Sequence, residues 1–180
     1  MCGTELPDIS VLDGIELLVL DVDGVLTDGR ITLTPQGDEV KSFHAKDGAG
    51  MKYWKRVGKK LAIISGRGSP AITRRAAELD VDVVRLNSKD KAPAYDEVLS
   101  ELGLSEQQTA VMGDDLTDLP LMARCALPMA PGDAADDVKA AAAYVTRLGG
   151  GAGCVREAIE TILRATGRWE EIMARYLRQR

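Results

Sequence analysis

Short apolar runs alternate with amphipathic stretches along most of the chain, and this alternation limits the possible folds more than any other feature. Runs of strand length cover residues 15–20, 60–65, 81–86, 109–113, 126–129 and 144–146. Segments with helical spacing or helix-boundary residues cover 47–57, 69–79, 89–102, 116–124, 133–141, 156–165 and 169–178. Because strands that alternate with helices pair in parallel, we predict an α/β fold: a doubly wound parallel sheet with helices on both faces.

One segment departs from this alternation and predicts a β-hairpin. Residues 30–33 and 39–44 flank the turn sequence Pro35-Gln36-Gly37-Asp38, so we expect a hairpin flap over residues 28–44. A glycine-rich run starting at Gly149 leads into two predicted helices, which gives a C-terminal tail over residues 149–180. The length of 180 residues suits one domain that covers the whole chain, residues 1–180.

Composition argues against several classes of protein. The net charge is −5 and no run of basic residues is present, so we expect neither a nucleic-acid partner nor polybasic membrane binding. The chain has no apolar stretch near the roughly 18–20 residues that span a bilayer and no secretory signal pattern, so we expect a cytoplasmic protein. The three cysteines form no CxxC pair and His44 is the single histidine, which argues against a zinc site.

Aspartates follow two of the predicted strands at their carboxyl ends. Asp21 and Asp23 come directly after the first strand, and Asp114 and Asp118 follow the strand over 109–113. Ligands of parallel sheets bind at this edge. Carboxylates held close together repel each other unless a cation joins them, and Mg²⁺ prefers such oxygen ligands. The pattern favours a magnesium site, and helix capping is the alternative interpretation of the second acidic group.

Two further segments suggest phosphate binding. Ser65-Gly66 ends a strand just before a helix with Ser69 as its N-cap, so a hydroxyl, backbone N–H groups and a helix start lie together. Lys91 lies near the start of the following helix. Read alone, the Ser65-Gly66 segment is a common strand–turn–helix connection, and Lys91 is a solvated lysine. Together with the aspartates they form a set in which each chemical group follows a successive strand.

This ordered set resembles the four motifs of the haloacid dehalogenase superfamily of phosphohydrolases. The matching segments are DVDGVLTDG at 21–29, ISGR at 64–67, Lys91 and GDDLTD at 113–118. The resemblance implies that Asp21 attacks phosphorus and becomes an aspartyl phosphate. It implies that Asp23 protonates the leaving oxygen and then activates water, while Ser65 and Lys91 bind the phosphoryl oxygens.

The resemblance also implies a Mg²⁺ cofactor. The ion would be held by Asp21, by the backbone carbonyl of Asp23 and by Asp114, with Asp115 or Asp118 acting through water. The connections that follow the first two motifs are too short for the cap domain that many superfamily members carry. An uncapped member acts on large substrates or is covered by a neighbouring subunit.

Nearly the whole chain resembles the uncapped family that hydrolyses 3-deoxy-D-manno-octulosonate 8-phosphate in lipopolysaccharide synthesis. The matching segments are FHAKDG at 43–48, GDDLTDLPLM at 113–122, YVT at 144–146 and GGGAG at 149–153. The resemblance implies a homotetramer in which hairpins and tails help to enclose active sites between subunits. It implies that the sugar acid phosphate contacts Asp23, His44, Ala45, Lys46, Asp47, Gly48, Lys52, Ser65, Gly66, Arg67, Arg75 and Lys91.

Two alternatives follow from the same resemblance. The family commonly has arginine where this chain has Lys46 and Lys52, and lysine lacks the bidentate fork that suits a carboxylate. A phosphatase for the nine-carbon 2-keto-3-deoxynonulosonate 9-phosphate is therefore the second hypothesis. Related domains fused to cytidylyltransferases serve in oligomerisation, but a domain with only that role would be free to lose the catalytic set, and this chain keeps all of it.

Overall fold

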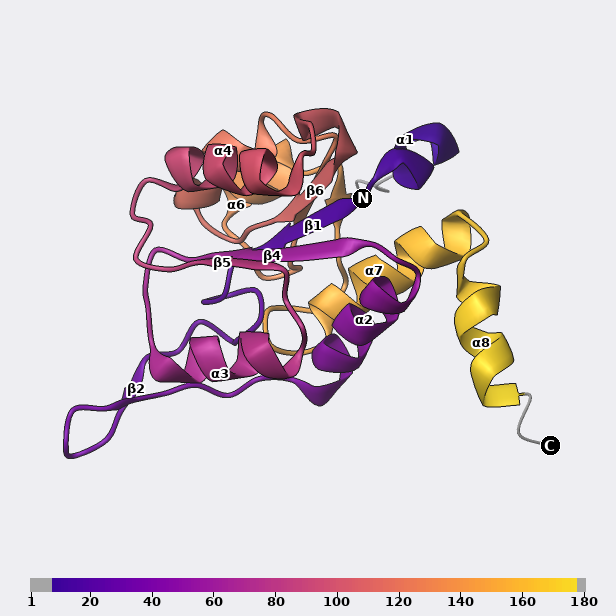
Figure 1. Cartoon of the computed structure of the whole chain (residues 1–180). Coiled ribbons are helices and arrows are strands. Elements are labelled where there is room, and N and C mark those ends of the chain that lie inside the picture. Colours follow the sequence, from indigo (N-terminus) through magenta and orange to yellow (C-terminus); the bar gives the residue numbers. More distant parts are fainter. Residues whose placement is uncertain (1–7, 178–180) are drawn as a thin grey trace.

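The computed structural model describes residues 8–177, and its centre is one six-stranded parallel sheet (Figure 1). The strands follow the order β5-β4-β1-β6-β7-β8. Their bounds are β1 Leu17–Leu20, β4 Lys60–Ile64, β5 Val83–Arg85, β6 Thr109–Met112, β7 Leu127–Ala130 and β8 Tyr144–Val145. The predicted doubly wound α/β fold is confirmed, with all six strands at the expected places.

Helices cover both faces of the sheet because neighbouring residues of β1 point to opposite sides. Leu18 and Leu20 belong to one core, and Leu17 and Val19 belong to the other. In Figure 1, α2, α3 and α7 lie below the sheet, on the side of the first core, and α4 and α6 lie above it. The bounds are α2 Ala45–Arg56, α3 Pro70–Glu78, α4 Lys91–Leu102, α5 Leu119–Met122, α6 Asp136–Ala141 and α7 Cys154–Ala165.

Local signals fix the ends of the helices nearest the site. Ser69 accepts a hydrogen bond from the backbone N–H of Ile72 and precedes Pro70, so α3 begins where the sequence predicts. Asp90 caps α4 by accepting from the N–H of Ala92. The same helix ends at Gly103 with φ at 65°, a left-handed conformation that glycine adopts without strain.

The hairpin is present, although its paired part is shorter than the sequence suggested. Strand β2, Thr32–Leu33, pairs antiparallel with β3, Glu39–Val40. It extends from the body of the molecule below α3 (Figure 1). Only two residues of each strand pair, and after β3 the side chain of Lys41 turns toward the body of the molecule and contacts Asp23.

Three other elements differ from the sequence-based expectation. A helix that was not predicted, α1 at Ile9–Gly14, precedes β1, and Asp8 caps it. The predicted helix over 116–124 is a 3₁₀ turn, Leu116–Asp118, followed by the short α5, because Asp115 and Asp118 cap the turn reciprocally and Pro120 starts a new helix. The helix predicted from 133 begins at Asp136, because the side chain of Asp133 accepts a hydrogen bond from Gly150 instead.

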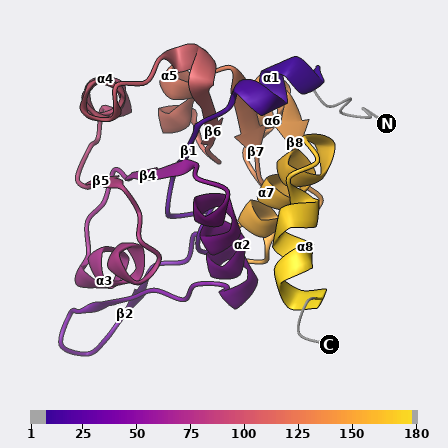
Figure 2. The same ribbon diagram turned by 45° about the vertical axis from the view of Figure 1, so that its right-hand side comes forward.

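The C-terminal part of the chain forms helix α8, Trp169–Leu177, which follows α7 and lies beside α2 (Figure 2). Its Trp169 and Ile172 are buried, and the Trp169 ring meets Tyr53 edge-on with ring centres 5.7 Å apart. The predicted end at residue 178 lies outside the described residues. Among the residues that the structure describes, no helix has both the length and the apolar character needed to cross a bilayer.

Candidate active site

The site is built at the carboxyl edge of the two central strands. Asp21 directly follows β1, and its backbone N–H donates to the carbonyl of Met112 in β6 at 3.1 Å. This bond holds the loop after β1 against the loop after β6. The side chain of Asp21 is 10% exposed, and Asp23 lies two residues further on. The first predicted pair of aspartates therefore stands where ligands of this fold class bind.

Three carboxylates come together from these two loops. Asp21, Asp114 and Asp118 each place an oxygen within 4.8 Å of the others. Oδ1 of Asp114 is buried and has no hydrogen-bond partner in the described part of the chain. A β-carbon at Gly24 would lie 2.0 Å from Oδ2 of Asp114, and the φ of Gly24 is +91°. Glycine at this position is thus needed for the two loops to approach.

The acidic residues at 114–118 are not only helix caps. Asp118 accepts from the backbone N–H groups of Asp114 and Asp115 through Oδ2, and its Oδ1 accepts from Lys91 at 2.6 Å. Asp115 is exposed and caps the 3₁₀ turn by accepting from Leu116. Asp118, rather than Asp115, therefore belongs to the carboxylate cluster.

Lys91 is the cation of this cluster. Its side chain is 2% exposed, and Nζ lies 2.8 Å from Asp21 and 2.6 Å from Asp118. Burial alone would lower the pKa of Lys91, but the charges of the two aspartates outweigh it and raise the pKa above its ordinary value. Lys91 is therefore a permanently charged, buried partner of Asp21 and not the solvated lysine of the alternative interpretation.

The carboxylates remain short of positive charge. Burial, followed by the nearby charges of Asp21 and Asp118, raises the pKa of Asp114 to about 7. Burial also raises the pKa of Asp21 to about 6, against the lowering effect of Lys91. One lysine does not balance three clustered carboxylates, so the cluster has the charge and the oxygen donors that a divalent cation requires.

The predicted phosphate-binding segment faces the same site. Ser65 directly follows β4, is buried, and its Oγ accepts from the backbone N–H of Arg67 at 3.3 Å. A cavity of about 420 Å³ collects these groups with the carboxylates. It is lined by Asp21, Asp23, Gly29, Ser65, Gly66, Arg67, Lys89, Lys91, Asp114, Asp115 and Thr117. Eight of the predicted site residues, from four separate segments of the sequence, thus share one cavity.

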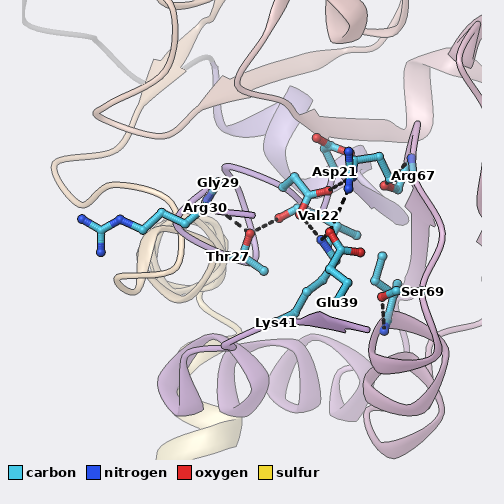
Figure 3. A network of polar contacts seen from close by, with 12 residues as sticks. Asp21, Val22, Thr27, Gly29, Arg30, Glu39, Lys41, Arg67 and Ser69 are labelled. Atoms are coloured by element: carbon cyan, nitrogen blue, oxygen red, sulfur yellow. Dashed lines mark hydrogen bonds and ion pairs between the residues drawn. The ribbon is translucent and has the colours of Figure 1, made fainter. Parts of the chain in front are cut away.

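The hairpin contributes two residues that the sequence analysis did not single out. Lys41 contacts Oδ1 of Asp23 through Nζ and lies 3.2 Å from Glu39. Arg67 donates to the same carboxylate of Glu39 at 3.0 Å. Figure 3 shows Lys41 and Glu39 reaching from the hairpin toward the loop after β1, with Arg67 approaching from the loop after β4. The alternation of Glu39, Val40 and Lys41 was the signal available in the sequence, since it places both charges on one face.

Several residues expected to contact the sugar lie elsewhere in this chain. His44 and Lys46 line a larger cavity of about 660 Å³ beside α7, which contains none of the four motifs. Ala45 and Arg75 line a third cavity with Phe43. Although the cavity beside α7 is larger than the cavity that contains Asp21, the latter holds the reactive groups, so the chemistry rather than the size identifies the active site.

The other three expected contacts are placed as follows. Asp47 is buried and accepts from the backbone N–H groups of Gly153 and Arg156, at 3.2 and 2.7 Å, which ties α2 to the start of α7. Gly48 is buried near the guanidinium of Arg75. Lys52 is exposed on α2. Within one chain, these residues do not line the cavity that contains Asp21.

Comparison with known proteins agrees with this geometry. The sequence model of the haloacid dehalogenase-like hydrolases matches residues 81–153. The 3-deoxy-D-manno-octulosonate 8-phosphate phosphatase KdsC of Haemophilus influenzae is 39% identical over 157 residues, which cover 87% of each chain. The fold and the site together define a haloacid dehalogenase-like hydrolase.

Comparison with solved structures narrows the family to which the chain belongs. The 3-deoxy-D-manno-octulosonate 8-phosphate phosphatase of Moraxella catarrhalis, determined with magnesium ion, phosphate ion and KDO, superposes with a TM-score of 0.90 at 34% identity, covering 93% of this chain and 97% of that one. The enzyme of the same name from Yersinia pestis gives a TM-score of 0.87 at 40% identity, covering 90% and 88%. This chain belongs to the family of the KdsC phosphatases.

Proposed function

We propose that this protein is a Mg²⁺-dependent phosphomonoester hydrolase that forms a covalent aspartyl phosphate on Asp21. The observation that carries the proposal is the contact of 2.8 Å between Nζ of Lys91 and Asp21 at the end of β1. This buried cation favours the ionised form of Asp21 and so opposes the effect of burial, which raises the pKa of this carboxyl group. A carboxylate held in this way, in a cavity that also contains a second aspartate, suits attack on phosphorus.

Two steps complete the reaction. First, an oxygen of Asp21 bonds to phosphorus while the bond from phosphorus to the sugar oxygen breaks, and Asp23 gives that oxygen a proton. Then a water oxygen bonds to phosphorus, the bond from phosphorus to Asp21 breaks, and Asp23 takes the proton from the water. Lys91, the hydroxyl of Ser65 and the backbone N–H groups near Gly66 would stabilise the charge on the phosphoryl oxygens.

Mg²⁺ fits the carboxylate cluster. Asp21 and Asp114 would hold the ion together with the carbonyl oxygen of Asp23, and Asp118 would act from the adjacent position. The support is the unpartnered, buried Oδ1 of Asp114 and the raised pKa values of the two ligand carboxylates. When bound, the ion supplies positive charge next to the transferring phosphoryl group.

The substrate that we propose is 3-deoxy-D-manno-octulosonate 8-phosphate, hydrolysed to the sugar acid and phosphate. The relatives that cover most of this chain carry this activity in their names. Arg67, half exposed at the cavity, offers a cation to the substrate's negative charge. The test is phosphate release from this compound, from the nine-carbon 2-keto-3-deoxynonulosonate 9-phosphate and from glucose 6-phosphate, each with Mg²⁺. A preference for the nine-carbon acid would replace the proposed substrate, and no hydrolysis of any of the three would contradict the phosphatase itself.

We also propose a homotetramer whose active sites are covered by neighbouring subunits. The hairpin supports this arrangement, since Ile31, Leu33 and Val40 are 52%, 62% and 47% exposed. Ile31 and Leu33 lie on one face of the hairpin and Val40 on the other, because Leu33 pairs with Glu39 and Thr32 with Val40. Exposed apolar side chains on both faces of a small projecting element favour contact with another protein surface. His44 and Lys46, which line a separate cavity in one chain, would then be free to meet substrate at a neighbour's site.

A further inference from the structure

A buried lysine of the hairpin contacts the second aspartate of the site. The side chain of Lys41 is 1% exposed, and Nζ contacts Oδ1 of Asp23. A lysine is rarely so deeply buried unless its charge is paired, and the removal of one partner of such a pair leaves an uncompensated charge. The contact therefore fixes the position of the Asp23 carboxylate relative to the hairpin.

The surrounding groups hold Lys41 itself in place. Glu39, two residues earlier on the same face of the hairpin, lies 3.2 Å from its Nζ and also accepts from Arg67. Val40, between them, is exposed on the opposite face. The hairpin, the loop after β1 and the loop after β4 are thus joined through four charged side chains (Figure 3).

The two oxygens of Asp23 are not equivalent in this arrangement. Oδ1 is engaged by Lys41, whereas Nε of Arg67 is 3.8 Å from Oδ2, too far for a hydrogen bond. Oδ2 is therefore the oxygen left to exchange a proton with a substrate, and Lys41 determines where that oxygen lies. Lys41 itself is too deeply buried to reach the substrate.

We infer that Lys41 is a positioning residue for the reaction: through its contact with Oδ1, it orients Asp23 so that Oδ2 faces the leaving oxygen. This inference rests on the proposed function, in which Asp23 exchanges the proton. It assigns to the hairpin a role in the chemistry of its own subunit, in addition to the proposed contact with neighbouring subunits.

The experiment measures kcat/KM for two aryl phosphates of similar shape, phenyl phosphate and 4-nitrophenyl phosphate, at saturating Mg²⁺. The nitrophenolate leaves without much help from an acid, whereas the phenolate needs a proton. Lys41→Met should lower kcat/KM about 100-fold for phenyl phosphate but less than tenfold for the nitro compound, and Lys41→Arg should recover part of the loss. Lys60→Met is the matched control, because Lys60 is also ion-paired, with Asp82 at 3.2 Å, but lies at the opposite end of β4.

A double-mutant cycle then tests whether Lys41 acts through Asp23. In the Asp23→Asn background, Lys41→Met should change kcat/KM for 4-nitrophenyl phosphate by no more than twofold. Equal losses for both aryl phosphates, or a loss that adds fully to that of Asp23→Asn, would overturn the inference and leave Lys41 a structural residue. If instead the wild-type protein hydrolysed no phosphate ester, the proposed function itself would fail.

Discussion

Gly150 lies directly against Gly24: a β-carbon at position 150 would stand 1.9 Å from the carbonyl oxygen of Gly24. The glycine run after β8 thus packs on the loop that follows Asp21 and Asp23. The N–H of Gly151 donates a hydrogen bond to the carbonyl of Val25, in the loop after β1, at 3.0 Å. The N–H of Gly150 donates to the side chain of Asp133, in the loop after β7, at 2.8 Å.

This close approach predicts that Gly150→Ala impairs both folding and catalysis. The added methyl group must displace the loop after β1, so we expect a loss of about 1–3 kcal/mol in the free energy of unfolding and a lower kcat. Denaturant unfolding and phosphate release measure the two effects. Gly14→Ala is the control, since nothing lies within 4 Å of a β-carbon there. Equal behaviour of the two variants would show that the loops are not tightly packed.

Asp21→Asn should abolish turnover and leave the fold intact. The amide is isosteric but lacks the nucleophilic charge, so we expect kcat to fall roughly 10⁴-fold or more. Circular dichroism and phosphate release are the measurements, with the exposed Asp136→Asn on α6 as the control. Residual activity within tenfold of the wild type would mean that Asp21 is not the nucleophile.

Mg²⁺ binding should weaken as the pH falls from 8 to 6. In the metal-free protein the pKa of Asp114 is raised from 3.8 to about 7, so protons compete with the ion below that pH. One competing proton weakens the apparent affinity by about tenfold per pH unit below the pKa. Calorimetric titration in buffers of different ionisation enthalpy measures the affinity and the proton release together. An affinity that does not change over this range would exclude Asp114 as a ligand.

The same groups give the metal-free protein a defined dependence of stability on pH. A carboxyl group whose pKa is raised in the folded state binds protons more tightly there than in the unfolded chain. The free energy of unfolding should therefore decrease as the pH rises from about 4 to about 7, the window set by Asp114, and saturating Mg²⁺ should reduce this decrease. Thermal unfolding in excess chelator and in Mg²⁺ tests the sign, and an increase in stability over this window without metal would contradict it.

Leu33→Asp should dissociate the proposed tetramer. The substitution places a charge among the exposed apolar side chains of the hairpin, where contact with another subunit would bury it. Sedimentation velocity reports the assembly, and Ile9→Asp, at an exposed apolar position on α1, is the control. If Leu33→Asp sedimented as the wild type does, the hairpin face that carries Leu33 would not be the subunit contact.

The sequence by itself determined the sheet, the helices α3 and α4 next to the site and the order of the reactive groups. These features depend on local rules: β1 is apolar at every position because both of its faces are covered, Ser69 and Asp90 cap the helices they precede, and each motif follows a strand at the same edge. Asp21, Ser65 and Lys91 could be assigned to one site because the parallel topology brings those strand ends together.

Only the tertiary structure decided which side chains meet within that edge. The pairing of Lys41 with Asp23, the choice of Asp118 over Asp115 and the burial of Asp47 against α7 each join groups from different segments. Side-chain contacts of this kind depend on how loops fold over one another, and no periodicity or capping rule encodes them. Residue types and strand order therefore predicted the chemistry, and loop packing decided which side chains contact each other.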